Sequence, residues 1–316
     1  MLKYIIKRIL WLVPIMIGVS LIVFTLMYLT PTDAAEIILG SNATAEKLTE
    51  LRHKMGLDQP FIGQYWNFLS GMLRGDFGTS YISNVPVWKS ISAAVPYSLR
   101  MGLIGLTVAS FLGISLGVLA ATHQNSWIDS VSMFFSLFFI SMPGFWFALM
   151  LVSIFAVELK WLPVMGVSKW QGYNLPCVSI ALASMARIAR QTRSSMLEVI
   201  RQDYITTIRA KGQTEHRVIY RHALKNALLP IITTIGGMVG GILGAGLVSE
   251  TIFSIPGMGV LLIKSISNRD YPVVQGCVVV ISLFASVVVL LTDILYALVD
   301  PRIRSQFQAR KKGVKE

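Results

Sequence analysis

Runs of about 20 apolar residues recur along this chain, and they constrain its fold more than any other feature. A helix of about 20 residues crosses the hydrocarbon core of a bilayer, because each residue adds about 1.5 Å of rise. The chain is 54% hydrophobic and only 14% charged, with a mean hydropathy of +0.63. A soluble domain cannot hide so many apolar residues. We therefore expect an all-α integral membrane protein.

The apolar runs divide into six predicted membrane-spanning helices. These cover residues 9–29, 98–121, 130–157, 173–189, 228–248 and 273–299. The first run follows three basic residues, but it is too long for the apolar region of a signal peptide, so we expect a retained helix. The predicted organisation is an N-terminus with the first span (1–29), an external segment (30–97), a five-span core (98–299) and a basic tail (300–316).

Basic residues predict the orientation of these spans. Eighteen of the 28 Lys and Arg residues lie at the N-terminus, between residues 187 and 225, or in the tail. Loops rich in Lys and Arg stay on the cytoplasmic side of a membrane, so both termini are expected there. The net charge of +12 then belongs to the membrane topology. We expect contact with membrane lipid and no nucleic-acid partner.

The segment at 30–97 is the one sizeable piece outside the predicted spans on the external side. Thr44 is a typical N-cap and Gly56 a typical helix stop, so a helix is expected between them. Pro60 suits the first turn of a second helix, and a turn is expected at 75–80. The sequence therefore predicts a small helical unit on the external face.

A polar, basic block at 203–230 interrupts the apolar runs and predicts a structured cytoplasmic loop. Apolar residues recur every four positions on one expected helix, as Met196, Ile200, Tyr204 and Ile208. Gly212 is expected to break this helix, Thr214 to begin a second one to about Ala227, and Pro230 to open the next span. Such an elbow suits either the groove of a partner protein or the anionic inner leaflet, and spacing alone favours neither.

The sequence offers no catalytic constellation. The four histidines are His53, His123, His216 and His222. None forms a metal-ligand pair, and no phosphate-binding glycine motif or nucleophile elbow is present. Cys177 and Cys277 are interpreted as small buried hydrophobes. We expect no catalytic residue, no metal and no cofactor on this chain.

Several motifs, taken in order, resemble the ABC-transporter permeases of the dipeptide, oligopeptide and nickel importer family. They are MGLDQP (55–60), GDFGTSY (75–81), SMPGFW (141–146), WLPVMG (161–166), DYITTIRAKG (203–212), HALKNALLP (222–230), SETIFSIPGMG (249–259) and NRDYPVVQG (268–276). The chain departs from the usual pattern at Thr206 and Ile208. The resemblance implies a type I importer permease fold in the bacterial inner membrane. It also implies a second homologous permease, two ATP-binding subunits that carry ATP and Mg²⁺, and an extracytoplasmic solute-binding protein.

The resemblance implies roles for three sets of residues. The ATPase-coupling candidates are Asp203, Tyr204, Arg209, Ala210, Lys211, Gly212, His222 and Asn226. The pathway or gate candidates are Gly236, Gly237, Gly240, Gly241, Gly244, Ser249 and Glu250. For the glycines the reason is that small residues let helices approach and slide, and static packing is the alternative. The binding-protein contact candidates are Asp58, Gln59, Asp76, Arg269 and Asp270. Arg187, Arg190 and Asp293 are expected to snorkel or pair with one another near the inner interface, and an entry-gate or substrate role is the alternative.

The sequence identifies neither the cargo nor a single class of membrane protein. Dipeptides, oligopeptides, glutathione, chelated nickel and an opine-like metallophore all fit the resemblance. A self-contained channel or secondary transporter is the alternative class, and it would need charged groups at the membrane midplane or paired repeats. A scaffold that only anchors an ATPase is a further alternative.

Overall fold

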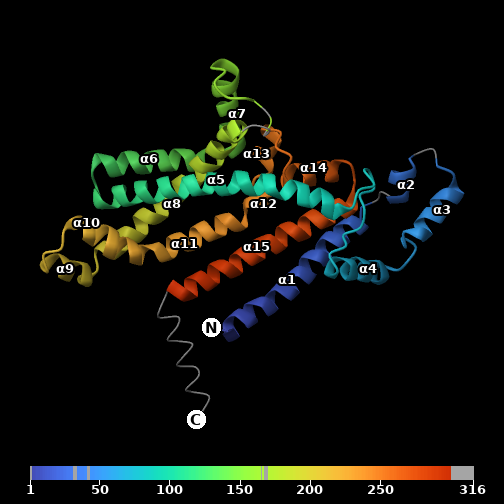
Figure 1. The fold of residues 1–316 in the computed structure, drawn as a ribbon, viewed down its shortest axis with the longest axis horizontal. Coiled ribbons are helices and arrows are strands. Elements are labelled where there is room, and N and C mark those ends of the chain that lie inside the picture. Colours follow the sequence, from blue (N-terminus) through green and yellow to red (C-terminus); the bar gives the residue numbers. More distant parts are fainter. Residues whose placement is uncertain (1, 31–33, 41–42, 165, 167–169, 300–316) are drawn as a thin grey trace, which may run out of the picture.

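The computed structural model describes residues 2–30, 34–40, 43–164, 166 and 170–299, and the predicted basic tail lies outside them. Within these residues the chain is built from helices, apart from an isolated antiparallel bridge between Thr79 and Pro86. This confirms the all-α prediction. Figure 1 shows an elongated bundle with the longest helices running lengthwise.

The helices differ widely in length. The longer ones are α1 (Leu2–Tyr28), α5 (Val87–Thr122), α6 (Trp127–Ser141), α8 (Asn174–Ile200), α11 (Leu224–Gly240) and α15 (Tyr271–Val299). The shorter ones are α2 (Ala34–Leu39), α3 (Ala45–Lys54), α4 (Phe61–Leu73), α7 (Gly144–Leu151), α9 (Asp203–Ala210), α10 (Glu215–Arg217), α12 (Ile242–Ala245), α13 (Leu247–Ile252) and α14 (Met258–Ser267). The π-helices η1 (Val152–Glu158) and η3 (Val218–Ala223) continue α7 and join α10 to α11, and the 3₁₀ helix η2 (Trp170–Tyr173) leads into α8.

Apolar length identifies the helices that suit a membrane. Among the described residues, four long helices are apolar enough to cross a bilayer: Arg8–Tyr28, Val87–Thr122, Glu215–Gly244 and Tyr271–Ile294. A fifth candidate is the pair α6 and α7 with η1, which is bent by 100°. The structure thus confirms a multi-span protein, and the count of six spans stays a prediction, since α8 is less apolar than these helices.

The bend between α6 and α7 follows from Pro143. Proline lacks an N–H and disfavours the helical region for the residue before it. Met142 accordingly has extended backbone angles (φ −74°, ψ 131°), and a new helix begins at Gly144. The predicted third span is therefore broken near its middle, and α7 projects sideways from the bundle (Figure 1).

The region of the fifth predicted span differs from the sequence expectation in two ways. Pro230 lies inside α11 and does not open a span, because the helix has already begun at Glu215 and continues through η3. The far end of the predicted span is broken at Gly241 and again at Gly246, which separate α11, α12 and α13.

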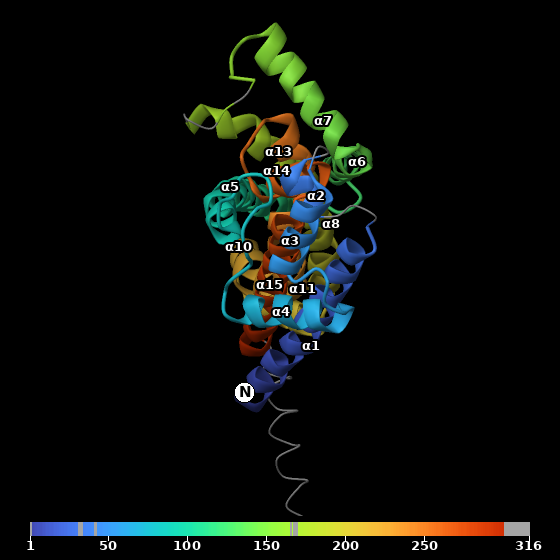
Figure 2. The same cartoon turned by 90° about the vertical axis from the view of Figure 1, so that its right-hand side faces the viewer.

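The α2–α4 segment forms at the end of the bundle opposite α9 and α10 (Figures 1 and 2). As predicted, Thr44 precedes α3, Gly56 ends the turn after it with φ +69°, and Pro60 precedes α4. Aromatic side chains hold α4 against α1, with the rings of Phe24 and Phe61 5.4 Å apart. The helix α5 begins at Val87, ahead of the predicted second span at 98–121.

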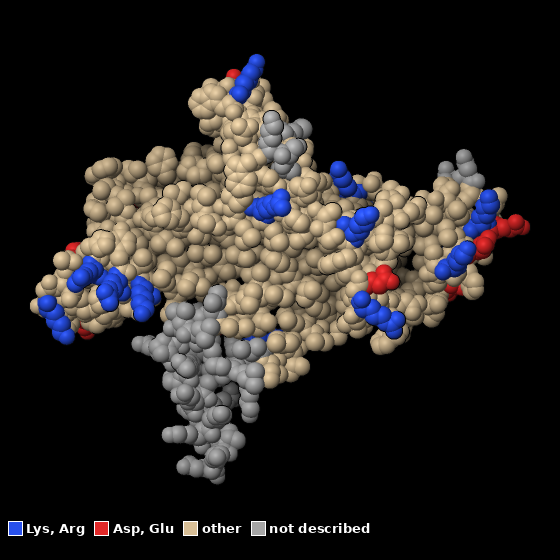
Figure 3. All heavy atoms as spheres, in the orientation of Figure 1, with Lys and Arg blue, Asp and Glu red and all other residues tan. Residues whose placement is uncertain are grey.

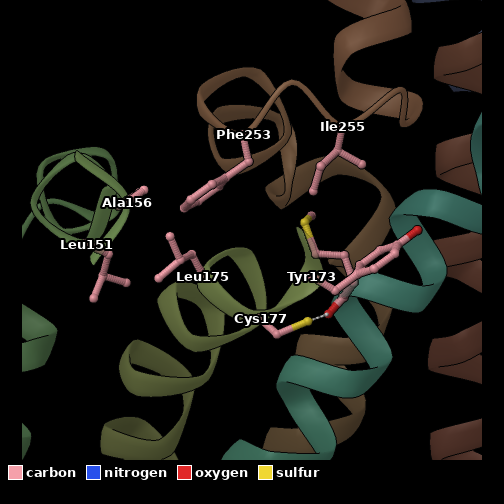
Figure 4. Packing of buried hydrophobic residues seen from close by; sticks show 9 residues of the cluster. Leu151, Ala156, Tyr173, Leu175, Cys177, Phe253 and Ile255 are labelled. Atoms are coloured by element: carbon pink, nitrogen blue, oxygen red, sulfur yellow. Dashed lines mark hydrogen bonds between the residues drawn. The ribbon is translucent and has the colours of Figure 1, made fainter. Parts of the chain in front are cut away.

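The core of the bundle lies between α5 and α8, which make the most extensive contact. At Gly117 a side-chain Cβ would lie 2.6 Å from the Ala189 carbonyl oxygen, so only glycine permits this approach. Towards the α13 turn, Tyr173, Cys177, Phe253 and neighbouring side chains form a buried cluster (Figure 4). This packing fixes the helices that carry the candidate sites.

Candidate functional site

A compact elbow joins α8 to α11, and we use this name for residues 201–227. α8 ends at Ile200, and the extended backbone of Gln202 (ψ 145°) starts α9 in a new direction. The predicted single stripe from residue 196 to residue 208 is therefore wrong. Met196 and Ile205 are the fully buried positions, whereas Tyr204 is 39% exposed.

The elbow is anchored by one apolar cluster. Its buried members are Val118, Ala121, Met196, Ile205, Val218, Ile219, Ala223 and Ala227. They come from α5, α8, α9, η3 and α11, so the elbow packs directly on the ends of the two central helices. A force applied to the elbow would therefore reach α5 and α8 through close-packed side chains.

Two polar links join the two arms of the elbow. Gly212 turns the chain with φ +77°, as expected of a residue without a Cβ. Across this turn the Arg209 guanidinium donates to both carboxylate oxygens of Glu215, at 2.6 and 3.2 Å. Asn226 also donates to the Tyr204 hydroxyl at 2.8 Å. Several of the predicted coupling residues thus shape the elbow itself.

The remaining coupling candidates form its surface. Asp203, Ala210 and Lys211 are exposed, and His222 is half-buried. Figure 3 shows that Lys and Arg side chains gather at this end of the molecule, while the middle of the visible face is largely neutral. The elbow therefore presents a basic, well-supported surface.

Sequence reasoning missed an ion pair beside the elbow. The Arg193 guanidinium on α8 donates to both oxygens of Asp129 on α6, at 2.5 and 2.7 Å, and Asp129 is buried. A bidentate pair of this kind is strong and directional. The sequence signal for this ion pair was Asp129 itself, an acidic residue that follows the Ser126 N-cap and begins an apolar run.

The glycine candidates of the gate do not share one environment. A Cβ at Gly236 would overlap the side chain of Thr292, so this glycine lets α11 approach α15, whereas a Cβ at Gly240 would make only ordinary contact with Ala285. Gly237 has open space beside it, and Gly244 is exposed. Gly241 caps the end of α11.

Glu250 is fully buried and holds the turn between α13 and α14. Its Oε1 accepts from the Ser98 hydroxyl at 2.5 Å, and its Oε2 accepts from the backbone N–H groups of Gly259 and Val260 at 2.8 and 3.2 Å. The Ser98 oxygen accepts from the Met258 N–H at 2.8 Å. Together, Glu250 and Ser98 satisfy the first N–H groups of α14. Ser249, the other candidate at this turn, is half-buried.

The predicted pairing of Asp293 with Arg187 or Arg190 is wrong. Asp293 on α15 instead forms an ion pair with Arg8 on α1, at 2.7 Å. The sequence could not show this, because the partner lies at the other end of the chain and is placed only when α1 packs along α15.

The candidates for binding-protein contact are grouped at the α2–α4 end but differ in accessibility. Asp58 is exposed, and its Oδ2 lies 2.6 Å from Nδ1 of His53. This hydrogen bond raises the pKa of His53 and lowers the pKa of Asp58. Gln59, Asp76 and Arg269 are exposed. Asp270 is buried, and its carboxylate accepts from the Ser80 hydroxyl and the Tyr81 N–H, so it is occupied within the chain.

A pocket of about 490 Å³ opens at the same end. It lies between the end of α1, α4, the turn at 76–79 and the start of α15. Its walls include the rings of Tyr28, Phe68 and Tyr271 and the polar side chains of Gln64 and Asn67. Among the described residues, no group of three or more His, Cys, Asp and Glu side chains is placed to hold a metal ion.

The structure is a multi-span helical bundle. It has a basic elbow at one end and a helical segment at the other, which is the form of a membrane transport subunit. The sequence profile described as "Binding-protein-dependent transport system inner membrane component" matches residues 113–305, and its N-terminal companion matches residues 1–102. The chain belongs to this family of inner-membrane permeases. It is therefore a transport subunit and not an enzyme, as predicted.

The chain is similar over almost its whole length to permeases of known transport systems. The dipeptide transport system permease protein DppB of Alkalihalophilus pseudofirmus is 38% identical, over 96% of this chain and 100% of its own length. The glutathione transport system permease protein GsiC of Escherichia coli K12 is 39% identical, over 96% of this chain and 99% of its own length. The predicted family resemblance is thus confirmed, while a nickel cargo has no specific support among these relatives.

A solved structure shares the fold. A chain of the inward-facing MetNI methionine ABC transporter is similar with a TM-score of 0.58 and 16% identity. The similarity covers 66% of this chain and 96% of that one. The ABC importer permease fold predicted from the sequence is therefore confirmed.

Proposed function

We propose that this chain forms half of the pathway of an ATP-driven importer for small peptides, a dipeptide or a glutathione-like peptide. A second homologous permease forms the other half, two ATP-binding subunits supply the energy, and a solute-binding protein delivers cargo. The relatives that transport dipeptides and glutathione support the cargo class. The six predicted spans place both termini and the elbow in the cytoplasm, and the α2–α4 segment outside.

The observation that carries this proposal is the elbow. It is exposed and basic on its outer side, and its Ile205 belongs to the buried cluster that includes Met196 of α8. We propose that the ATPase subunits grip the elbow and tilt α8 and α5 when they bind ATP. Each state of the ATPase then favours one state of the permease, which is the requirement for coupling.

The test is reconstitution in liposomes. We expect uptake of labelled dipeptide only when the chain is combined with its second permease, the ATPase subunits, ATP and loaded binding protein. The purified chain alone should give no uptake. Uptake by the chain alone would identify a channel or secondary transporter, and assembly without any uptake would identify a scaffold.

Charge on the elbow surface should fix how the ATPase docks. We expect Lys211→Glu to weaken association with the ATPase subunits, and more strongly at low salt. Screening extends over about 8 Å at physiological salt and about 30 Å at 0.01 M, so a reversed charge acts further at low salt. The measurement is co-purification of the ATPase across a salt series. Lys54→Glu, at an exposed position on α3, is the matched control and should leave co-purification unchanged. Equal binding by both variants at every salt concentration would contradict docking at the elbow.

A further inference from the structure

A charged side chain on α5 has no role in the sites described above. Arg100 lies well inside this apolar helix, and its side chain is exposed. Among the described residues, no Asp or Glu lies within ion-pair distance of its guanidinium. Charged groups in membrane helices usually pair with one another or face a water-filled cavity. An exposed arginine without a carboxylate partner therefore indicates a functional site.

A buried hydroxyl lies beside this guanidinium. Tyr173, which directly precedes α8, is 5% exposed, and its side chain extends towards α5 (Figure 4). Its hydroxyl forms no hydrogen bond within the described residues, and Arg100 is the charged group close enough to act on it. Arginine has only donors, so it cannot accept the proton of this hydroxyl. A cation and a hydroxyl donor thus lie together, and neither has a carboxylate acceptor in the described part of the chain.

This turn of α5 packs against the interrupted helices that follow α11. A Cβ at Gly102 would overlap the side chain of Ile242, and a Cβ at Gly246 would lie 3.1 Å from the Met101 side chain. Gly246 separates α12 from α13. Non-helical backbone within a membrane is tolerated only where protein covers it or where it lines a water-filled cavity. We therefore expect the part of the bundle around Arg100 to face the pathway and not lipid.

The charged side chains of α5 and of its neighbour α14 are all basic. They are Arg100, Lys89 and Lys264, and all three are exposed. The acidic residues that flank α14, Glu250 and Asp270, are buried and accept hydrogen bonds within the chain. Across the middle of the visible face in Figure 3, the few charged side chains are Lys and Arg. Such a surface attracts anionic groups.

We propose that Arg100 binds the carboxylate of the peptide cargo at the outer mouth of the pathway, with the Tyr173 hydroxyl as a further donor. This inference rests on the proposed function, because a dipeptide and a glutathione-like peptide both carry a free carboxylate. Arg100 is near the outer end of the span predicted at 98–121, where cargo enters. A guanidinium donates two parallel hydrogen bonds to one carboxylate, and such charge-assisted bonds are about twice as strong as neutral ones. The same carboxylate accepts the proton of the Tyr173 hydroxyl.

The test measures weak peptide binding to the complete transporter in nanodiscs, without the binding protein, by saturation-transfer NMR. The probes are alanyl-phenylalanine and its C-terminal amide, which lacks the carboxylate. We expect the natural transporter to bind the free acid about tenfold more tightly, the effect of one charge-assisted contact. Arg100→Gln should bind both peptides equally. Arg100→Lys should keep part of the preference, because it retains the charge but not the fork of donors. Arg74→Gln, an exposed charge change on the α2–α4 segment, is the matched control and should keep the full preference.

Tyr173→Phe removes only the hydroxyl, and it is the second variant if Arg100→Gln fails to assemble. It should weaken binding of the free acid and leave binding of the amide unchanged. Equal or undetectable binding of the two peptides by the natural transporter would overturn the inference. So would an unchanged preference in Arg100→Gln, or an equal loss of both peptides, which would show that Arg100 holds a lipid headgroup or the fold itself.

Peptide uptake in liposomes separates this inference from the proposed function. Normal uptake of dipeptide without any preference for the free acid would overturn the role of Arg100 alone. Absence of both uptake and peptide binding would overturn the two proposals together.

Discussion

Replacement of Glu250 by alanine is expected to remove most of the folded protein. The change leaves the buried N–H group of Gly259 and the partly buried N–H group of Val260 without their acceptor, and it frees the Ser98 hydroxyl. Each unsatisfied buried N–H costs about 1–3 kcal/mol, and a cavity adds to this. The measurement is the amount of monodisperse protein in detergent and its thermal unfolding midpoint.

Two further variants make the Glu250 result specific. Glu250→Gln should have a smaller effect, because its amide oxygen still accepts from the two backbone N–H groups. Thr251→Ala, at an exposed position one residue further on, should change little. A Glu250→Ala protein as stable as Thr251→Ala would show that the turn between α13 and α14 does not depend on this carboxylate.

Replacement of Gly212 by valine is expected to uncouple transport from ATP hydrolysis. A Cβ at Gly212 would meet no atom within 4 Å, so the effect comes from the backbone and not from a clash. A left-handed conformation costs an L-residue about 1–2 kcal/mol, and more for a β-branched one. We expect coupled transport to fall about tenfold or more, since about 1.4 kcal/mol corresponds to a factor of ten. ATP hydrolysis and peptide uptake are measured together in liposomes.

Gly212→Asn is the matched control for the valine variant. Among residues with a Cβ, asparagine is one of those that best tolerate positive φ, so this variant should retain most of the coupled transport. Both proteins should insert in the membrane equally. Normal transport in Gly212→Val would show that the elbow is a passive loop on the membrane surface, and it would remove the main physical support for docking there.

Local features of the fold were predictable because their causes are local. Thr44, Gly56 and Pro60 mark helix ends through the backbone preferences of single residues, and the structure places helix ends there. Gly212 was identified in the same way, and its φ of +77° confirms it. The stripe through Met196 and Tyr204 failed because periodicity does not reveal a turn of two residues between helices.

The sequence by itself determined that this is a multi-span membrane protein, because the length and polarity of a run decide whether it crosses a bilayer. Its ordered motifs, by resemblance, pointed to a permease. The sequence also located the elbow through a single glycine between basic helices. Only the tertiary structure decided the roles of Glu250, Asp270 and Asp293. Their partners are Ser98, Ser80 and Arg8. Residues so far apart along the chain meet only once the helices pack, and local pattern carries no information about which side chains will then face each other.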